Sequence, residues 1–154
     1  MALNFTGARV LSECHYLCGD FQKTAVCGRQ KLAGRDAQLV NSFFGNTSYS
    51  GYIEQLLIEQ YGSTEVDSID INAFEGANVV LDLSEPITDR KLLLQYDTVI
   101  DLGTSEHVYN VAQGFKNISL LCKSGGRIIH VLPANNWVNH GFWQISPELY
   151  SRLY

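Results

Sequence analysis

The second half of the chain alternates short apolar segments with a helical segment, and this pattern restricts the fold more than any other feature. Segments rich in Val, Ile and Leu, each followed by Asn, Ser, Gly or Pro, occupy residues 65–71, 78–83, 96–102 and 127–132. Their length and composition predict β-strands. Residues 106–121 place apolar side chains on one side of a helix, with Glu106 in its first turn. Apolar strands that alternate with helices predict a parallel sheet covered on both faces.

Three further elements are predicted outside this half. Residues 24–27 form a short apolar run closed by a glycine, which indicates another strand. Residues 52–61 have helical spacing, and Gly62 is a natural C-cap for that helix. Ser146 and Pro147 indicate the start of a last helix, as N-cap and first helical residue.

The remaining segments carry weaker signals. The stretch 31–51 is rich in Gly, Ser and Asn and predicts a loop. Residues 1–20 are interpreted as an N-terminal arm, either a short helix or irregular, ahead of one domain over residues 21–154. The expected fold class is α/β, a Rossmann-like three-layer sandwich with a mostly parallel sheet.

Length, composition and charge exclude several classes of protein. The 154 residues, 45% of them apolar, suit one folded domain. The start of the chain has no secretory-signal pattern, and no apolar stretch approaches the roughly 18 residues of a membrane span, so a soluble cytoplasmic protein is expected. Residues 36–110 hold thirteen acidic and two basic side chains, which argues against binding nucleic acid phosphates.

The cysteines do not predict a metal site. Four are present without a C-x-x-C motif, and the histidines do not complete a zinc-ligand spacing. Cys14, His15 and Cys18 are close in sequence, but no fourth ligand is evident. Reduced, mostly buried thiols are the simpler interpretation, and no metal is expected.

Polar residues at the carboxyl ends of the predicted strands are the candidates for ligand binding, because ligands of such sheets bind there. Asp70, followed by Asn72, is placed to accept hydrogen bonds from ribose hydroxyls, or it faces solvent in a turn. Asp82 is placed to accept from an adenine amino group, or it caps the following turn.

The segment after residues 96–102 adds further candidates. Gly103 permits a sharp turn and a close approach of ligand after Asp101. His107 is placed to act as a base, or it packs against the strand ends. His140 lies in an Asn-rich loop after the last strand, where a substrate would meet a cofactor, whereas His130 is interpreted as a hydrogen-bonded core or edge residue.

Taken together, these segments resemble class I S-adenosylmethionine-dependent methyltransferases over about residues 24–154. The likeness rests on VDSIDIN (66–72), NVVLDLSEPI (78–87), YDTVIDLGTSEHVYN (96–110) and LCKSGGRIIHVLPANN (121–136). The tail NHGFWQISPELYSRLY (139–154) is similar to a segment of a methyltransferase-like subgroup.

The resemblance implies S-adenosylmethionine as cofactor and a role for each candidate. Gly28 would face the methionine part, Asp70 with Asn72 the ribose, and Asp82 the adenine. Asp101 and Gly103 would border the sulfonium. His107 or His140, with His130 as another choice, would serve as a base if the acceptor must lose a proton.

Two departures from the family pattern qualify this expectation. The turn after residues 24–27 has one glycine, Gly28, and lacks the G-x-G-x-x-G spacing. The chain also stops at Tyr154, whereas family members continue through two more strands; the resulting open sheet edge predicts self-association.

Three hypotheses follow. The first is an active methyltransferase acting on an unidentified small molecule or protein. The second is a catalytically silent methyltransferase-like binding module. The third, a dinucleotide-dependent reductase, is disfavoured because the pyrophosphate-binding turn is missing.

Overall fold

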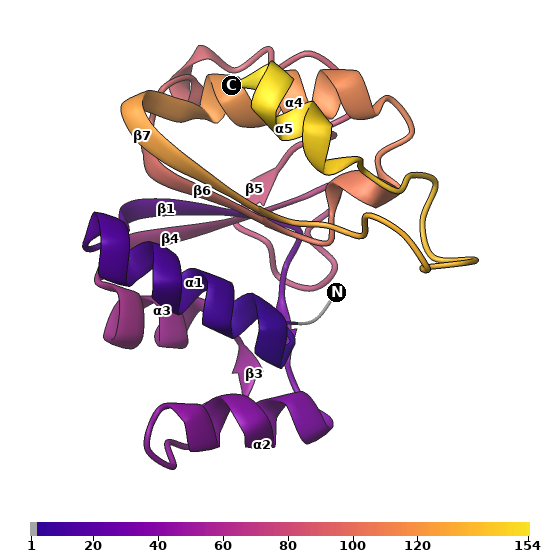
Figure 1. Ribbon diagram of the computed structural model, residues 1–154. Helices are drawn as coiled ribbons and strands as arrows, with labels where there is room; N and C mark the ends of the chain where they lie inside the picture. The colour runs from indigo at the N-terminus through magenta and orange to yellow at the C-terminus, as the bar shows by residue number, and fades with distance from the viewer. Residues whose placement is uncertain (1–2) are drawn as a thin grey trace.

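Five strands form the central sheet of the computed structural model, which describes residues 3–154. They are β1 (Gln22–Cys27), β4 (Ser63–Asp70), β5 (Val79–Val80), β6 (Tyr96–Leu102) and β7 (Cys122–Val131). The spatial order is β5-β4-β1-β6-β7, and every neighbouring pair is parallel (Figure 1). Counted along the chain this order is 3-2-1-4-5, which is the order of Rossmann-like nucleotide-binding folds. The predicted α/β class is confirmed.

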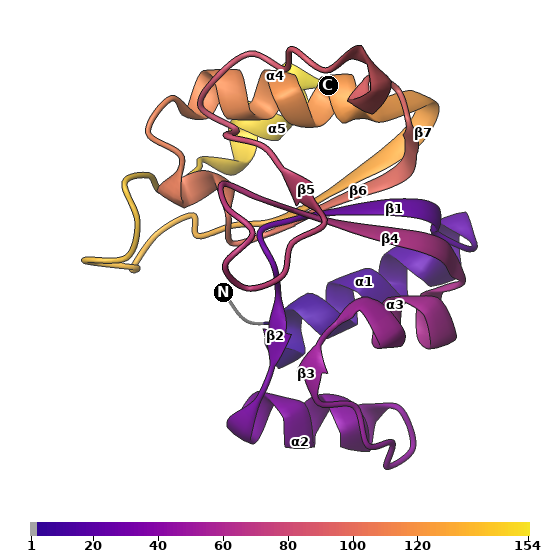
Figure 2. The same cartoon turned by 180° about the vertical axis from the view of Figure 1, so that it is seen from behind.

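Helices cover both faces of this sheet and make three layers. The helices α1 (Phe5–Cys18) and α3 (Glu54–Tyr61) lie on one face, and α4 (Val111–Leu121) and α5 (Pro147–Leu153) lie on the other (Figures 1 and 2). Alternate residues of a strand point to opposite faces. Val26 accordingly packs into the core beside α1 and α3, while its neighbour Ala25 packs into the core beside α4.

The N-terminal segment is helical, one of the two forms that the sequence left open. The Asn4 side chain caps α1 by accepting a hydrogen bond from the Gly7 N–H at 2.8 Å. Ala8 and Leu11 are fully buried against the sheet, so α1 is part of the core layer. On the same face, Gly62 ends α3 in the left-handed conformation (φ 64°), as predicted.

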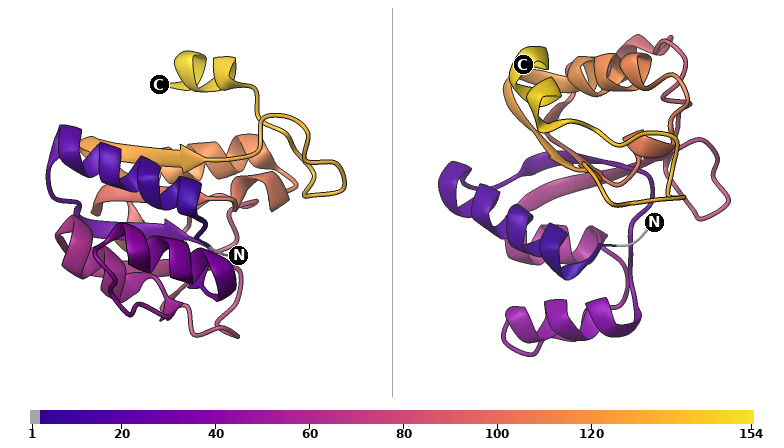
Figure 3. Two further views of the ribbon diagram at one scale, coloured as in Figure 1. Left: turned by 60° about the horizontal axis from the view of Figure 1, so that its bottom comes forward. Right: turned by 45° about the vertical axis from the view of Figure 1, so that its right-hand side comes forward.

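The loop expected within the stretch 31–51 occupies only residues 44–50. This stretch contains the helix α2 (Gly34–Phe43) between two short strands, β2 (Lys31–Leu32) and β3 (Gly51–Tyr52), which pair antiparallel. Figure 3 shows α2 standing away from the sheet, beyond α1 and α3. Val40 is the one fully buried residue of this helix, and Ala37 and Phe44 pack partly buried against the same core cluster.

The predicted helix over residues 106–121 begins later than expected. A 3₁₀ turn occupies Ser105–His107, and α4 starts at Val111 with Asn110 as its N-cap. The predicted strand at 78–83 is reduced to β5, and β7 begins at Cys122 instead of residue 127. Across residues 3–154, no helix is long and apolar enough to cross a membrane.

Candidate functional site

A pocket of about 240 Å³ opens at the carboxyl ends of β1, β4 and β6. In parallel α/β sheets, ligands bind outside these ends, where the strand order reverses. Here the order reverses at β1, since the chain continues to β4 on one side and later to β6 on the other. We call this the strand-end pocket; its walls are Gly28, Ile69, Asp70, Ile71, Leu81, Asp82, Leu83, Ser84, Thr104, His107 and Val108.

The two aspartates predicted to lie side by side both line this pocket. The pairing of β4 with β5 places Asp70 opposite Val80, and the Leu81 N–H donates to the Asp70 carbonyl at 2.9 Å. This leaves Asp70 and Asp82 on one pocket wall. Both aspartates therefore line one pocket, as expected for strand ends at the same sheet edge, while their contact with a ligand stays a prediction.

Backbone hydrogen bonds fix the orientation of both carboxylates. Asp70 accepts from the Ile71 N–H at 2.8 Å and from the Arg29 N–H at 3.2 Å. Asp82 accepts from the Ser84 N–H at 2.8 Å. A carboxylate has about four acceptor sites, so each side chain keeps capacity for hydroxyl or amino donors of a ligand.

The turn after β1 forms the floor of the pocket with a single glycine. Gly28 has a φ of 69°, and its N–H donates to the Ile69 carbonyl at 2.6 Å, which joins the turn to β4. The next residue, Arg29, stabilises the turn through its side chain. Its Nε lies 3.0 Å from Glu54 Oε1, and its guanidinium carbon lies 3.8 Å from the centre of the Tyr52 ring. This turn therefore contains one glycine and is stabilised by the contacts of Arg29, whereas a glycine-rich turn has several glycines.

Asp101 has a different position from the one expected. It is fully buried, and its Oδ1 accepts from the backbone N–H groups of Thr104 and Ser105 at 3.1 and 3.2 Å. Its Oδ2 accepts from the Ser105 hydroxyl at 2.6 Å and lies 3.0 Å from His130 Nδ1. The carboxylate shapes the turn after β6 and is turned away from the ligand space.

Asn72 also has another partner. It is exposed, and its side-chain oxygen accepts from the Phe74 N–H at 2.9 Å, forming a local turn beyond the pocket wall. Asn72 is not among the residues that line the strand-end pocket, so its contact with a ribose stays a prediction.

A second pocket, of about 490 Å³, lies beside the first at the carboxyl ends of β6 and β7 and the start of α1. Gly103 and His140 belong to it, so the candidates divide between two pockets. We call it the helix-side pocket; it is lined by Leu3, Asn4, Thr6, Gly7, Asp36, Leu102, Gly103, Glu106, Val131, Leu132, Pro133, Trp137 and His140.

Glu106 lies between the two pockets and was missed as a site residue. Its side chain is 1% exposed, its Oε1 is 3.4 Å from His140 Nε2 and 3.9 Å from His107 Nε2, and burial raises the pKa of its carboxyl group. The two imidazole rings lie 5.0 Å apart. In the sequence, Glu106 looks like an ordinary acidic residue in the first turn of a helix. The only signal that could have marked it as a site residue is its neighbour His107, in the turn after Gly103.

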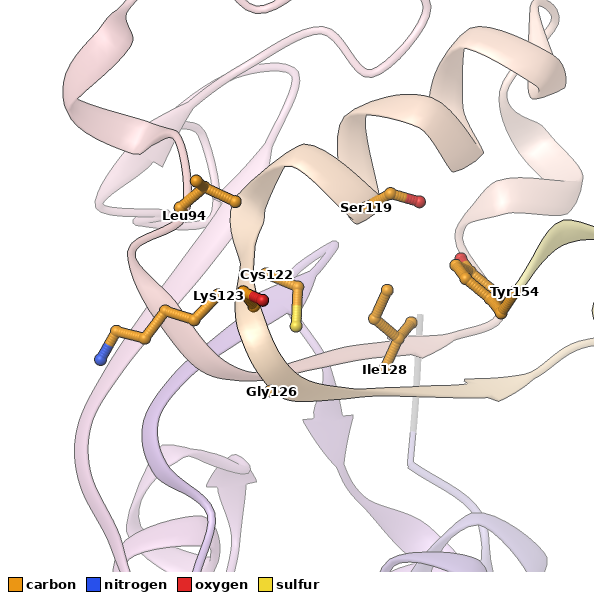
Figure 4. Close-up of a pocket in the computed structure, with 8 residues that line it drawn as sticks. Leu94, Ser119, Cys122, Lys123, Gly126, Ile128 and Tyr154 are labelled. Carbon is orange, nitrogen blue, oxygen red and sulfur yellow. The ribbon is translucent and has the colours of Figure 1, made fainter.

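Another cavity, of about 460 Å³, lies at the opposite end of β7 (Figure 4). Cys122, Gly126 and Ile128 of β7 line it, and Tyr154 closes one side. Because this cavity is not at the carboxyl ends of the strands, it does not correspond to the ligand position of a Rossmann-like sheet.

The solved structures that resemble this chain include a methyltransferase. The crystal structure of the trans-methyltransferase CalH in complex with SAH is similar over 79% of this chain and 34% of that chain, with 15% sequence identity and a TM-score of 0.46. No protein-family model and no curated protein matches the sequence. The chain thus spans about a third of the length of that methyltransferase.

Proposed function

We propose that the chain binds S-adenosylmethionine in the strand-end pocket and transfers its methyl group to an acceptor in the helix-side pocket. The observation that carries this proposal is the presence of Asp70, Asp82 and the Gly28 turn in one pocket at the point where the strand order reverses.

The adenosine part has a partner for each of its chemical features. Asp70 accepts from the ribose hydroxyls and Asp82 from the adenine amino group, while Leu81 and Val108 cover the ring. At about 240 Å³ the pocket is small, which suits a nucleoside with its methionine part extending past Gly28. The helix-side pocket falls within the roughly 300–1,000 Å³ of small-molecule sites, so it suits a small acceptor or a protein side chain.

Methyl transfer needs alignment more than reactive side chains. The bond between sulfur and methyl breaks as the acceptor atom attacks in line, and the sulfur keeps the electron pair. The protein contributes mainly by holding the two reactants in that line. An acceptor that carries a proton must lose it, and His107 and His140, each about half exposed beside the two pockets, are the candidate bases.

One observation favours a silent binding module as the second candidate. The turn after β1 is closed by Arg29, which reaches Glu54, Tyr52 and the carbonyl of Glu75. A turn fastened in this way leaves less room for the methionine part than a glycine-rich turn does. Binding of the demethylated product without turnover of any acceptor would assign the chain to this class.

Calorimetric titration with S-adenosylmethionine and with S-adenosylhomocysteine tests the proposal. We expect both to bind and Asp70→Ala to weaken binding by about 1–3 kcal/mol, the cost of a lost hydrogen bond to a charged group. Asp97→Ala, at the amino end of β6, is the matched control and should leave the affinity unchanged. If neither compound binds, the proposal fails; if Asp70→Ala binds as well as the parent, the ribose lies elsewhere.

A further inference from the structure

Three potential metal ligands meet between the two pockets. One ligand atom from each of Glu106, His107 and His140 lies within 4.8 Å of the others. Within residues 3–154, no other set of three such side chains brings its ligand atoms this close. His140 comes from the loop after β7, so the set forms only when that loop folds over the turn after β6.

The spacing of these atoms suits a zinc-like ion. Ligands at about 2.0–2.1 Å from a tetrahedral zinc ion are about 3.3–3.4 Å from each other. Glu106 Oε1 is 3.4 Å from His140 Nε2 and 3.9 Å from His107 Nε2. Small side-chain movements would close the remaining difference. Two imidazoles with one carboxylate favour a transition metal over magnesium or calcium, which prefer oxygen ligands.

Glu106 also lacks a full set of partners. Its side chain is almost completely buried, and among residues 3–154 its Oε2 has no hydrogen-bond donor. A buried carboxylate oxygen without a donor is costly. The two histidines are each 43% exposed, so an ion has access from the solvent side while the carboxylate faces it from the protein interior.

The protein backbone holds the loop of His140 against Glu106. The N–H groups of Phe142 and Trp143 both donate to the Glu106 carbonyl, at 2.7 and 3.2 Å. Gly141 approaches so closely that a Cβ there would lie 2.8 Å from that carbonyl oxygen. Trp137 lies against the His140 ring at 5.0 Å. The loop that carries His140 is therefore held against Glu106 mainly by main-chain contacts that involve no coordinating atom.

We propose that Glu106, His107 and His140 bind a divalent transition-metal ion of the zinc type. Three protein ligands leave a fourth position for water or for an oxygen atom of a substrate. If the proposed function is correct, that position lies beside the methyl donor, and the acceptor is a compound whose oxygen can bind the metal. The histidines then act as ligands, and the bound oxygen loses its proton more readily because of the metal charge.

Titration of the chelator-treated protein with ZnCl₂ tests the metal site directly, without S-adenosylmethionine or any acceptor. We expect one ion per chain and an affinity reduced at least tenfold in Glu106→Gln and in His140→Ala. His15→Ala is the matched control, because it also removes the alternative ligand set of Cys14, His15 and Cys18; its affinity should equal that of the parent. Co²⁺ in place of Zn²⁺ should give the strong visible bands of a four-coordinate site, and His140→Ala should lose them.

The outcomes separate this proposal from the proposed function. Absence of saturable Zn²⁺ binding, equal binding by both variants, or loss of binding in His15→Ala would each overturn the metal site. Circular dichroism verifies that Glu106→Gln is folded. If Glu106→Gln does not fold, the binding measured for His140→Ala, a change in an exposed loop, decides the test. Titration of S-adenosylhomocysteine into the metal-free protein tests the strand-end pocket on its own.

Discussion

At the scale of single residues, Tyr61 joins two helices of one layer. It is the last residue of α3, and its hydroxyl donates to the Ala8 carbonyl of α1 at 3.0 Å and lies 3.1 Å from the Ser12 hydroxyl. Its ring stacks on Phe21 with centroids 5.2 Å apart. Because α1 forms a wall of the helix-side pocket, this contact also positions that wall.

Replacement of Tyr61 by Phe should remove the hydrogen bonds and retain the packing. We expect a loss of about 0.5–1.5 kcal/mol in the free energy of unfolding at pH 7. Tyr16→Phe, a change at a side chain that is 86% exposed, should have no effect. Denaturant titration of the three proteins measures both values.

The stability of the parent protein and that of Tyr61→Phe should depend differently on alkaline pH. Burial raises the pKa of Tyr61 from 10.0 to about 12. A group whose pKa is higher in the folded state contributes full stability below its unfolded pKa and loses it as the pH rises toward the folded value. The advantage of the parent over Tyr61→Phe should therefore shrink between pH 10 and 12. An advantage that stays constant over this range would contradict the assignment.

Site residues that directly follow a predicted strand could be predicted from the sequence, whereas those that depend on tertiary contacts could not. Asp70 and Asp82 could be found because each follows an apolar run that must end at the same sheet edge. Asp101 occupies an equivalent place, but its burial depends on Ser105 and His130, which only the folded chain brings to it. Glu106 and His140 are far apart in sequence, so no local spacing indicates their contact.

At the scale of elements, α5 and its C-cap Tyr154 meet the sheet through aromatic contacts with His130. The Tyr150 ring stacks on His130 with centroids 5.2 Å apart and meets the edge of Phe115 at 6.3 Å. A seven-residue helix is only marginally stable alone, so these contacts stabilise α5.

Removal of that ring should release α5 locally. We expect Tyr150→Ala to increase amide hydrogen exchange over residues 147–154 and to leave β1 and β4 protected, with a loss of about 0.5–1.5 kcal/mol for the aromatic pair. Tyr150→Phe keeps the ring and should exchange like the parent. A uniform increase across the chain would mean that α5 supports the whole fold.

The elements with strong periodicity were predictable, and those held by isolated contacts were not. The strands β4 and β6 follow from their apolar runs, and α3 from its spacing and its glycine cap. The helix α2 buries one residue and is held partly by an edge contact of Phe43 with Phe5, 5.8 Å away, which no local pattern contains. The late start of α4 reflects the buried hydrogen bonds of Asp101.

At the scale of the whole molecule, one edge of the sheet is formed by the ten-residue strand β7. Within the part of the chain that the structure describes, β7 pairs with β6 alone. An unpaired edge of this length is a template for another strand.

We expect the protein to self-associate in a concentration-dependent manner. Light scattering after size exclusion should show a molar mass above that of one chain, 17.2 kDa, which falls toward it on dilution. A single mass of one chain at every concentration would contradict pairing through this edge.

The central place of β1 has a consequence for how the protein is made. The walls of the strand-end pocket come from segments that extend from Gly28 to Val108, so no shorter continuous fragment contains them all. A chain emerging from the ribosome would therefore gain affinity for the pocket's ligand only after most of its length has been synthesised. Ligand binding to a chain still on the ribosome would then indicate that β1 has paired with both β4 and β6.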